Sequence, residues 1–315
     1  MFEKVLDEIK TGNQKLTIIL GSGFHNQALG NLSILSNWEV LLSKLDNGKN
    51  LSKKYTLDFE QILVNQTNNQ DLSTNHNASK IEHQEIKRIG KFLEEEQKWV
   101  LSQPNRFKYP NLFNPKYVSD VISLNFDHIA EELCKKQFGL DKQIKWQNKS
   151  SFSEIYKENS VSSIYRCTSF RELTDDKGNN LRFWYPHGSI LRPNTITLGV
   201  NKYSRLVSDT IRIRNHFKKN EREKNENDLT WFSQIIQNPV LILGASISEA
   251  EWGLWSALVY KKKNFSKPSN LIKEKLIFKM MSEDESKTNN FWFDPLFKNR
   301  AFEDQWNLLQ KMLTD

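Results

Sequence analysis

The sequence predicts an α/β fold: a Rossmann-like, mostly parallel sheet with helices on both faces. Three apolar, β-branched runs carry this prediction: LTIIL at 16–20, VSDVISL at 118–124 and PVLIL at 239–243. Each run is followed by a turn of small or polar residues and then by a stretch of helical periodicity. Strand, turn and helix repeated in this order are typical of parallel sheets, because the crossover connections place helices on the two faces.

Two further β-rich runs, SIYRCTSF at 163–170 and LRFWYPHGSI at 181–190, flank the segment TDDKGNN. Turn-forming residues between two β-rich arms favour a hairpin or an antiparallel edge of the sheet. At the C-terminus, NRAFEDQWNLLQKMLTD predicts an amphipathic helix with Phe302, Trp306, Leu309 and Met312 along one side.

The segment 45–117 predicts a helical insert within a single domain that spans residues 1–315. LDFEQILVNQ and SKIEHQEIKRIGKFLEEEQKWVLSQ carry apolar residues at helical spacing. Between them, the stretch 65–80 (NQTNNQDLSTNHNASK) has no apolar periodicity and therefore predicts a loop.

Composition excludes several classes of protein. The chain has two cysteines, Cys134 and Cys167, which rules out a disulfide framework and a four-cysteine zinc site. No apolar run is long enough to cross a membrane, and the N-terminus lacks the apolar core of a signal peptide, so we expect a cytoplasmic protein. The other five histidines besides His187 have no metal-ligand spacing, and we expect no metal site.

The net charge of +7 is spread along the chain, with local runs at 218–227 and 260–267. These runs are compatible with solvated helix faces and also with a surface that attracts nucleic acid or an acidic partner. No helix-turn-helix, zinc-finger or RNP pattern supports sequence-specific nucleic-acid recognition.

The first strand ends in a glycine-rich turn, Gly21-Ser22-Gly23, that leads into a predicted helix. Glycines let the backbone approach a ligand, and the unpaired N–H groups at a helix start suit a diphosphate. The turn lacks the third glycine of the dehydrogenase pattern G-x-G-x-x-G, whose place is taken by Asn26. A tight strand-to-helix turn without a ligand explains the same residues.

Polar residues also follow the other strands, at the edge where α/β folds place ligands. Asn125 and Asp127 follow the second strand, although an Asx-turn and a helix N-cap also account for them. His187 precedes a Gly-Ser pair and is a candidate general base or a structural histidine. The turn that starts at Gly244 ends the third strand, and Ser248 with Glu251 has the spacing of a capping box.

In this order, the four stretches resemble the sirtuin-like domain family of prokaryotic antiviral-defence NAD hydrolases. The resemblance is carried by Gly21-Ser22-Gly23-Phe24, Leu124-Asn125-Phe126-Asp127, His187-Gly188-Ser189 and Gly244-Ala245-Ser246-Ile247-Ser248-Glu249. It spans most of the chain outside 45–117 and the C-terminal tail. Two positions depart from the family pattern: His25 stands where a serine is usual, and Ala245 where an aromatic residue is common.

The resemblance implies that NAD⁺ is the substrate, cleaved to nicotinamide and ADP-ribose. In this interpretation His187 is the general base and Asn125 positions the nicotinamide ribose or the attacking water. Asp127 lies beside the nicotinamide. The NAD diphosphate would contact Gly21, Ser22, Gly23 and Phe24, and the adenosine ribose would contact Gly244, Ala245 and Ser246. Sirtuin deacylases usually carry a zinc module of two cysteine pairs, which this chain cannot build, so hydrolysis is favoured over deacylation.

The resemblance further implies a toxic effector of an antiphage abortive-infection system. Its activity would be controlled by a separate sensor protein or a regulated oligomer. By analogy, the sensor is a HerA-type ATPase, a short argonaute or a nucleotide-binding subunit. Two alternatives stay open. The departures at His25 and Ala245 also suit a catalytically silent module that binds NAD or ADP-ribose, and the positive charge suits a nucleic-acid-binding protein with a Rossmann-like scaffold.

Overall fold

The computed structural model describes residues 2–11, 14–30, 33–45, 55–68, 75–139, 144–148, 165–219, 229–247, 251–264, 277–281, 292–297 and 301–314. Across these ranges the strands form one eight-stranded mixed sheet in the order β3-β4-β5-β2-β1-β6-β7-β8. The predicted α/β fold with a mostly parallel sheet is confirmed.

The three predicted strands form the centre of the sheet. They are β1 (Leu16–Leu20), β2 (Val118–Ser123) and β6 (Val240–Leu243), and β1 pairs in parallel with both neighbours. Next to β2, β5 (Asn180–Trp184) is also parallel. Beyond β6, the short strands β7 (Ile277–Lys279) and β8 (Asp294–Pro295) continue the parallel order.

The predicted hairpin is present with different bounds. Its arms are β4 (Ser169–Thr174) and β5, which pair antiparallel, and β3 (Trp146–Asn148) adds an antiparallel edge. The prediction for 163–170 was wrong over Tyr165–Thr168, which form the short helix α8, and the strand in 181–190 stops at Trp184. In the hairpin turn, Oδ1 of Asp175 accepts hydrogen bonds from the backbone amides of Lys177 and Asn179.

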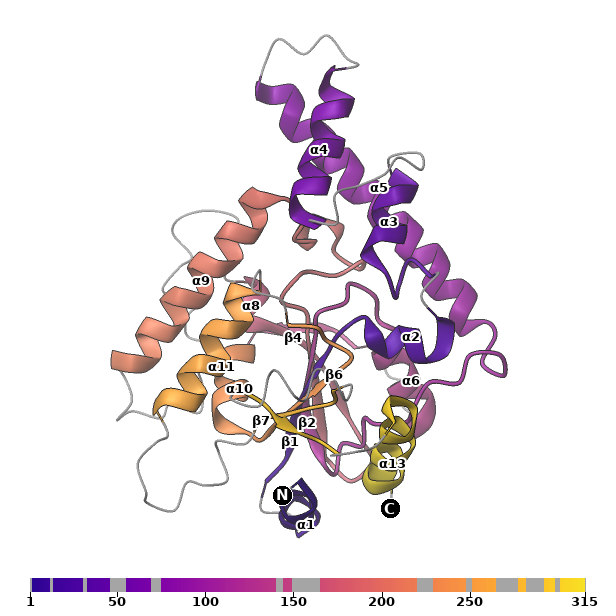
Figure 1. Cartoon of the computed structure of the whole chain (residues 1–315), viewed down its shortest axis with the longest axis vertical. Helices are drawn as coiled ribbons and strands as arrows, with labels where there is room; N and C mark the ends of the chain where they lie inside the picture. Colours follow the sequence, from indigo (N-terminus) through magenta and orange to yellow (C-terminus); the bar gives the residue numbers. More distant parts are fainter. Residues whose placement is uncertain are drawn as a thin grey trace.

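Helices cover both faces of the sheet (Figure 1). One face carries α1 (Phe2–Lys10), α2 (Gly23–Leu29), α6 (Ile129–Phe138) and α13 (Phe302–Thr314). The other carries α9 (Val200–Lys219), α10 (Trp231–Gln237) and α11 (Trp252–Asn264). Alternate residues of a strand point to opposite faces of the sheet, so the sheet has a hydrophobic core on each face. Ile18 and Val121 pack into the core under the first group of helices, and Ile19 and Ile122 pack into the core under the second.

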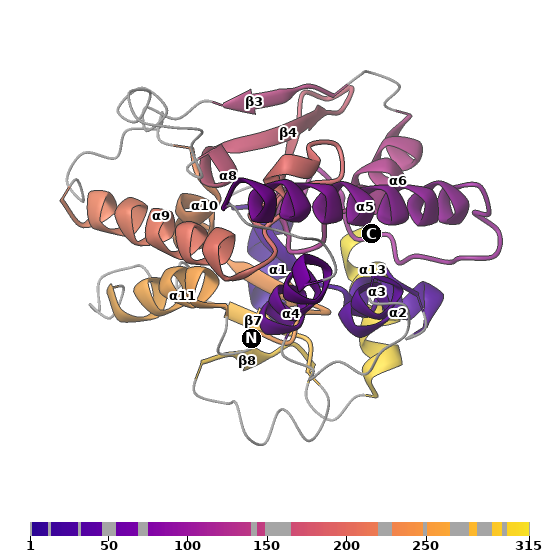
Figure 2. The same cartoon turned by 90° about the horizontal axis from the view of Figure 1, so that it is seen from above.

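Three helices, two from the predicted insert and one that precedes it, lie beyond the carboxyl ends of the parallel strands (Figures 1 and 2). They are α3 (Trp38–Leu45), α4 (Tyr55–Asn68) and α5 (Asn75–Leu101). The loop predicted at 65–80 was wrong at both ends, because 65–68 belong to α4 and 75–80 to α5; the remainder lies outside the described residues. α4 and α5 contact each other, and each buries apolar residues, among them Ile62 of α4 and Ile81 of α5.

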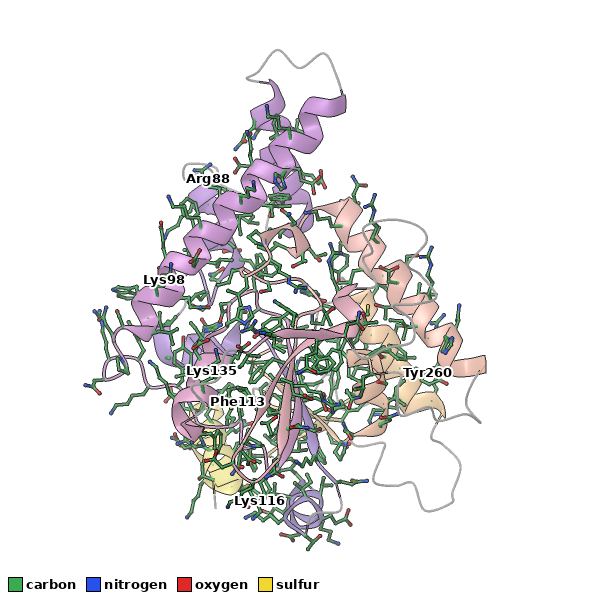
Figure 3. The ribbon with its side chains drawn as sticks, turned by 180° about the vertical axis from the view of Figure 1, so that it is seen from behind. Arg88, Lys98, Phe113, Lys116, Lys135 and Tyr260 are labelled. Atoms are coloured by element: carbon green, nitrogen blue, oxygen red, sulfur yellow. The ribbon has the colours of Figure 1, made fainter. Side chains whose placement is uncertain are left out.

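Side-chain hydrogen bonds tie these helices to the sheet edge. Oε1 of Gln97 on α5 accepts from the backbone amide of His128, and Oε1 of Glu96 accepts from the hydroxyl of Ser33. The opposite side of α5 carries charged residues such as Lys98 (Figure 3). Lys98 forms an exposed ion pair with Glu94, one turn away.

The predicted C-terminal amphipathic helix is confirmed as α13, which buries Trp306 and Leu309. Both cysteines are buried and free, and burial raises the pKa of each thiol to about 12. In the described residues, no helix combines the length and apolar character needed to cross a membrane.

Candidate functional site at the carboxyl edge of the sheet

The four motif stretches meet at one edge of the sheet. They follow β1, β2, β5 and β6, which are consecutive neighbours in the order β5-β2-β1-β6. Leu20 at the end of β1 pairs with Ser123 of β2 and with Leu243 of β6. Ile122 pairs with Trp184, so Asn125 and His187 each lie three residues beyond a paired position on adjacent strands. The sequence therefore predicted the common placement of these segments correctly.

The glycine-rich turn packs directly against the turn after β6. The amide of Gly21 donates to the carbonyl of Leu243 at 2.9 Å, and the amide of Gly23 donates to the carbonyl of Gly244 at 2.8 Å. A Cβ atom at Gly21 would lie 2.5 Å from the oxygen of Gly244, and one at Gly23 would lie 2.7 Å from the Cα of Gly244. Close contact between the first and fourth stretches thus requires both glycines, whether or not a ligand binds.

Other backbone amides of this turn also have protein acceptors. The amide of Phe24 donates to the carbonyl of Gly21, and those of His25 and Asn26 donate to the carbonyl of Ser22. Phe24 points into the core, where its ring packs beside Tyr109. The backbone amides of Gly21 and of residues 23–26 therefore all donate to protein carbonyls in this structure.

Asn125 connects the second stretch to the first. Its Nδ2 donates to the carbonyl of Gly21 at 3.1 Å, and its backbone amide donates to the hydroxyl of Ser123 at 3.2 Å. Asn125 is buried, with 8% of its surface exposed. On the far side of the glycine turn, Ala245 is buried and Ser246 is exposed.

Asp127 is buried and has partners on both carboxylate oxygens. Oδ1 accepts from the amide of Ile129 at the start of α6, and Oδ2 lies 2.9 Å from Nε2 of His25. The N-cap of α6 is His128, so the N-cap interpretation of Asp127 was wrong by one residue. The other ring nitrogen of His25 lies 3.1 Å from the hydroxyl of Tyr109. Burial by itself raises the pKa of Asp127, but the charge and hydrogen bond of His25 outweigh it and lower that pKa. His25 is thus a structural partner of Asp127.

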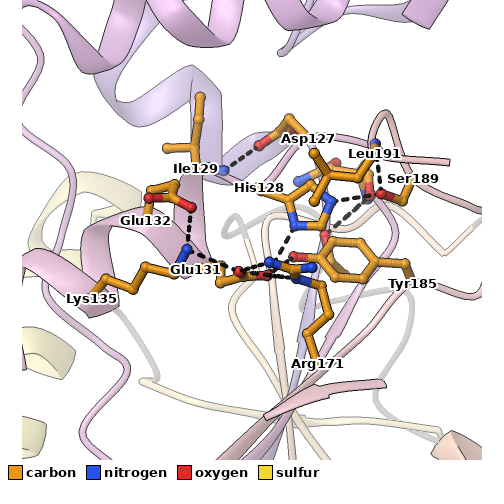
Figure 4. Close-up of polar contacts among 12 residues, drawn as sticks. Asp127, His128, Ile129, Glu131, Glu132, Lys135, Arg171, Tyr185, Ser189 and Leu191 are labelled. Atoms are coloured by element: carbon orange, nitrogen blue, oxygen red, sulfur yellow. Dashed lines mark hydrogen bonds and ion pairs between the residues drawn. The ribbon is translucent and has the colours of Figure 1, made fainter. Parts of the chain in front are cut away.

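A second buried network joins the second and third stretches (Figure 4). Nδ1 of His128 lies 2.9 Å from Oε2 of Glu131, and Nε2 lies 2.6 Å from the hydroxyl of Ser189. Glu131 also accepts bidentate hydrogen bonds of 2.8 to 3.0 Å from the guanidinium group of Arg171. It accepts a further one from the hydroxyl of Tyr185 at 3.2 Å. Burial raises the pKa of Glu131, but His128 and Arg171 more than offset this effect, so the pKa lies well below its ordinary range.

The order serine, histidine, carboxylate is that of a hydrolase triad, yet the surroundings indicate a structural role. Ser189, His128 and Glu131 are all fully or almost fully buried. The hydroxyl of Ser189 already accepts from the amide of Leu191 at 3.1 Å, and the amide of Ile190 donates to the carbonyl of Phe126. The network therefore fastens the turn after β5 to the segment after β2.

His187 lies at the start of the turn that this network fastens. Its Nε2 is 3.2 Å from Oε2 of Glu251, and the same oxygen accepts from the hydroxyl of Tyr203 at 3.1 Å. The side chains of His187 and Glu251 are 12% and 23% exposed. Burial alone raises the pKa of Glu251, but the charge of His187 and hydrogen bonds from His187 and Tyr203 prevail and lower it. Glu251 is therefore an anionic partner of the imidazole.

The predicted capping box is only half observable, because Ser248 and Glu249 lie outside the described residues. Glu251, directly before α11, turns its carboxylate to His187 and Tyr203. Sequence reasoning missed this partnership, as it missed His128, Glu131 and Arg171. Each contact joins residues from segments distant along the chain, and no local spacing signals it.

Asn125 and His187 line separate cavities. A small cavity of about 10 Å³, enough for roughly one water molecule, lies between His187, Tyr203 and Glu251, and its apolar walls include Leu124 and Trp231. Another small cavity, of about 20 Å³, is lined by Asn125, Asp127 and apolar residues that include Trp38 and Leu93. The structure thus brings the two predicted catalytic residues to one edge without joining them in one cavity.

In the described ranges, no three His, Cys, Asp or Glu side chains cluster in a way that could hold a metal ion. A scan against models of known protein families and a search of curated protein sequences both find no match to this chain.

Proposed function

We propose that this protein is an NAD⁺ glycohydrolase whose reaction takes place at the carboxyl edge of the sheet. The observation that carries the proposal is the pairing of His187, in the turn after β5, with the Glu251 carboxylate, while Asn125 follows the adjacent strand β2. A histidine held by a carboxylate is an effective general base, and this sheet edge is where α/β folds bind nucleotides.

The reaction is cleavage of the bond between the nicotinamide ring and ribose C1′. The leaving group is already cationic and departs neutral, so the ring needs no proton, and positive charge develops on the ribose. The protein must then hold the ribose and activate a water molecule on its far side. We assign the first task to the amide of Asn125 and the second to His187.

The size of the cavities indicates how the activity is controlled. Small-molecule and cofactor sites usually occupy about 300 to 1,000 Å³. The two cavities, of about 10 and 20 Å³, each have room for little more than a water molecule, so neither holds NAD⁺ in this structure. We therefore propose that the two cavities join when a partner engages the protein, and that the enzyme is inactive without it. A separate sensor in an antiphage abortive-infection system suits an activity that would deplete cellular NAD⁺.

The test is chromatography of NAD⁺ after incubation with the full-length protein, alone and with cell extract from phage-infected cells of its native host. Nicotinamide and ADP-ribose are expected with the wild type and are expected to fall at least about 100-fold with His187→Ala or Asn125→Ala. His83→Ala, an exposed histidine of α5, is the matched control and should retain full activity. Equal activity in His187→Ala would refute the assigned base.

A second candidate is a catalytically silent module that binds NAD or ADP-ribose. It is favoured by the bonded state of the glycine turn and by Asp127, whose two oxygens already have protein partners. Calorimetric titration with NAD⁺ and with ADP-ribose on the same samples distinguishes the two candidates. Binding without nicotinamide release under every activating condition would support the silent module, and absence of binding would refute both.

A further inference from the structure

Three separate elements converge on one carboxylate oxygen. His187 follows β5, Tyr203 belongs to the first turn of α9, and Glu251 directly precedes α11. Oε2 of Glu251 lies 3.2 Å from Nε2 of His187 and 3.1 Å from the hydroxyl of Tyr203. Because the anchors come from a strand end and two helix starts, the oxygen is held in one place relative to the imidazole.

The chemistry of these groups determines which ring nitrogen of His187 carries the proton. An ionised carboxylate only accepts hydrogen bonds, so Nε2 must present an N–H to it. Burial and the nearby carboxylate raise the pKa of Tyr203, so the phenol keeps its proton and donates to Oε2 as well. In a neutral imidazole, the lone pair is then on Nδ1. Within the part of the chain that the structure describes, Nδ1 of His187 has no hydrogen-bond partner.

We propose that Glu251 is a positioning residue that locks His187 in the Nε2–H tautomer and leaves Nδ1 as the basic atom of the site. The catalytic part of this inference rests on the proposed NAD⁺ hydrolysis, whereas the tautomer itself does not. Tyr203 supports Glu251 by fixing the shared oxygen. A carboxylate that sets the tautomer of a catalytic imidazole is a recurrent device in hydrolases.

The proposed step balances as follows. Nδ1 of His187 takes a proton from water while the water oxygen forms a bond to ribose C1′. The bond from C1′ to the nicotinamide nitrogen breaks, and its electron pair neutralises the pyridinium ring. His187 becomes an imidazolium ion, which the Glu251 carboxylate stabilises, and the proton then leaves to solvent.

The first experiment reads the tautomer directly and needs no activity. Long-range ¹H–¹⁵N spectra of protein labelled at histidine nitrogens distinguish Nε2–H from Nδ1–H in the neutral ring, and His187→Ala assigns the signals. The wild type is expected to show Nε2–H. In Glu251→Gln the amide can donate to Nε2, so the tautomer is expected to shift toward Nδ1–H, while Glu95→Gln on the exposed face of α5 leaves it unchanged. An Nδ1–H wild type, or no shift in Glu251→Gln and Glu251→Leu, would overturn the proposal.

The second experiment measures the consequence for NAD⁺ cleavage under activating conditions. Glu251→Gln is expected to lower kcat by roughly 10- to 100-fold with little change in KM, as part of the general-base contribution of 10²–10⁴. Tyr203→Phe should lower it less, and Glu251→Asp should recover part of the loss. An unchanged kcat in Glu251→Gln would overturn the catalytic part. If the wild type cleaves no NAD⁺ but Glu251→Gln still shifts the tautomer of His187, the proposed function is refuted and the positioning of His187 by Glu251 stands.

Discussion

Replacing Arg171 by methionine removes the guanidinium partner of Glu131, a carboxylate buried in the core. Glu131 has no exposed surface, and Arg171 contacts both of its oxygens with hydrogen bonds of 2.8–3.0 Å. Methionine retains much of the length of arginine and its packing beside Trp146, so the change acts mainly on the charge. Breaking a buried ion pair by removing one partner usually costs about 3–5 kcal/mol.

We expect a loss near the lower limit, about 3 kcal/mol, because Glu131 keeps other partners. The imidazole of His128 and the hydroxyl of Tyr185 remain, and Nζ of Lys135 lies 3.4 Å from Oε1. The measurement is equilibrium urea unfolding followed by the fluorescence of the tryptophans. Lys98→Met serves as the control, because its ion pair with Glu94 has side chains 71% and 50% exposed. It should cost less than about 0.5 kcal/mol.

The pH dependence of the Arg171→Met effect has a definite sign. Glu131 has a lowered pKa in the folded wild type, so its contribution is present above its unfolded pKa and is lost as the pH falls through the folded one. Without Arg171, the pKa of Glu131 in the folded protein rises, so its carboxyl group accepts a proton at a higher pH than in the wild type. The stability gap between wild type and variant is therefore expected to narrow as the pH falls from about 5 toward the lowered pKa of Glu131 in the wild type. A loss below about 1 kcal/mol, or a gap that widens on acidification, would refute this account of the network.

Three more outcomes are expected. Gly23→Ala should destabilise the protein by about 2–3 kcal/mol in urea unfolding, because the new Cβ would meet the backbone of Gly244. Gly30→Ala places its Cβ in open space and should cost only about 1 kcal/mol, from its positive φ, so equal losses in the two variants would contradict the packing argument. His25→Leu should lower the free energy of unfolding by about 2–3 kcal/mol near neutral pH, because Asp127 loses its imidazole partner. This loss should shrink in acid, where Asp127 becomes protonated, so a pH-independent loss would count against the pairing. Both cysteines should resist a thiol reagent at mildly alkaline pH in the folded protein and react after unfolding, and rapid reaction of the folded protein would contradict their burial.

The central strands and the edge at which the candidate site lies follow from local patterns in the chain. The runs at 16–20, 118–124 and 239–243 are mostly apolar because these strands are covered on both faces, and each ends at a turn that must lie at the carboxyl edge. Local patterns were less informative at the periphery. β7 and β8 are two or three residues long, and the polar ends of α4 and α5 have no apolar repeat, so packing against neighbours decides their structure.

The partners of the site residues could not be predicted in the same way. His128 and Ser189 are 61 residues apart along the chain, and His187 reaches a glutamate whose spacing indicated only a helix cap. Their contacts depend on the order and register of strands and on the direction in which each turn leaves the sheet. Likewise, the histidine after Phe24 was an unexplained departure until its pairing with Asp127 was seen.

The sequence by itself therefore determined the α/β class, the central strands and the polar residues at their ends, because burial periodicity and turn chemistry are local properties. Only the tertiary structure decided the environment of each polar residue: Asn125 against the glycine turn, Asp127 against His25, and His187 against Glu251. Hydrogen bonds and charge interactions act over a few ångströms in space, and the chain distances that they bridge are set by the fold.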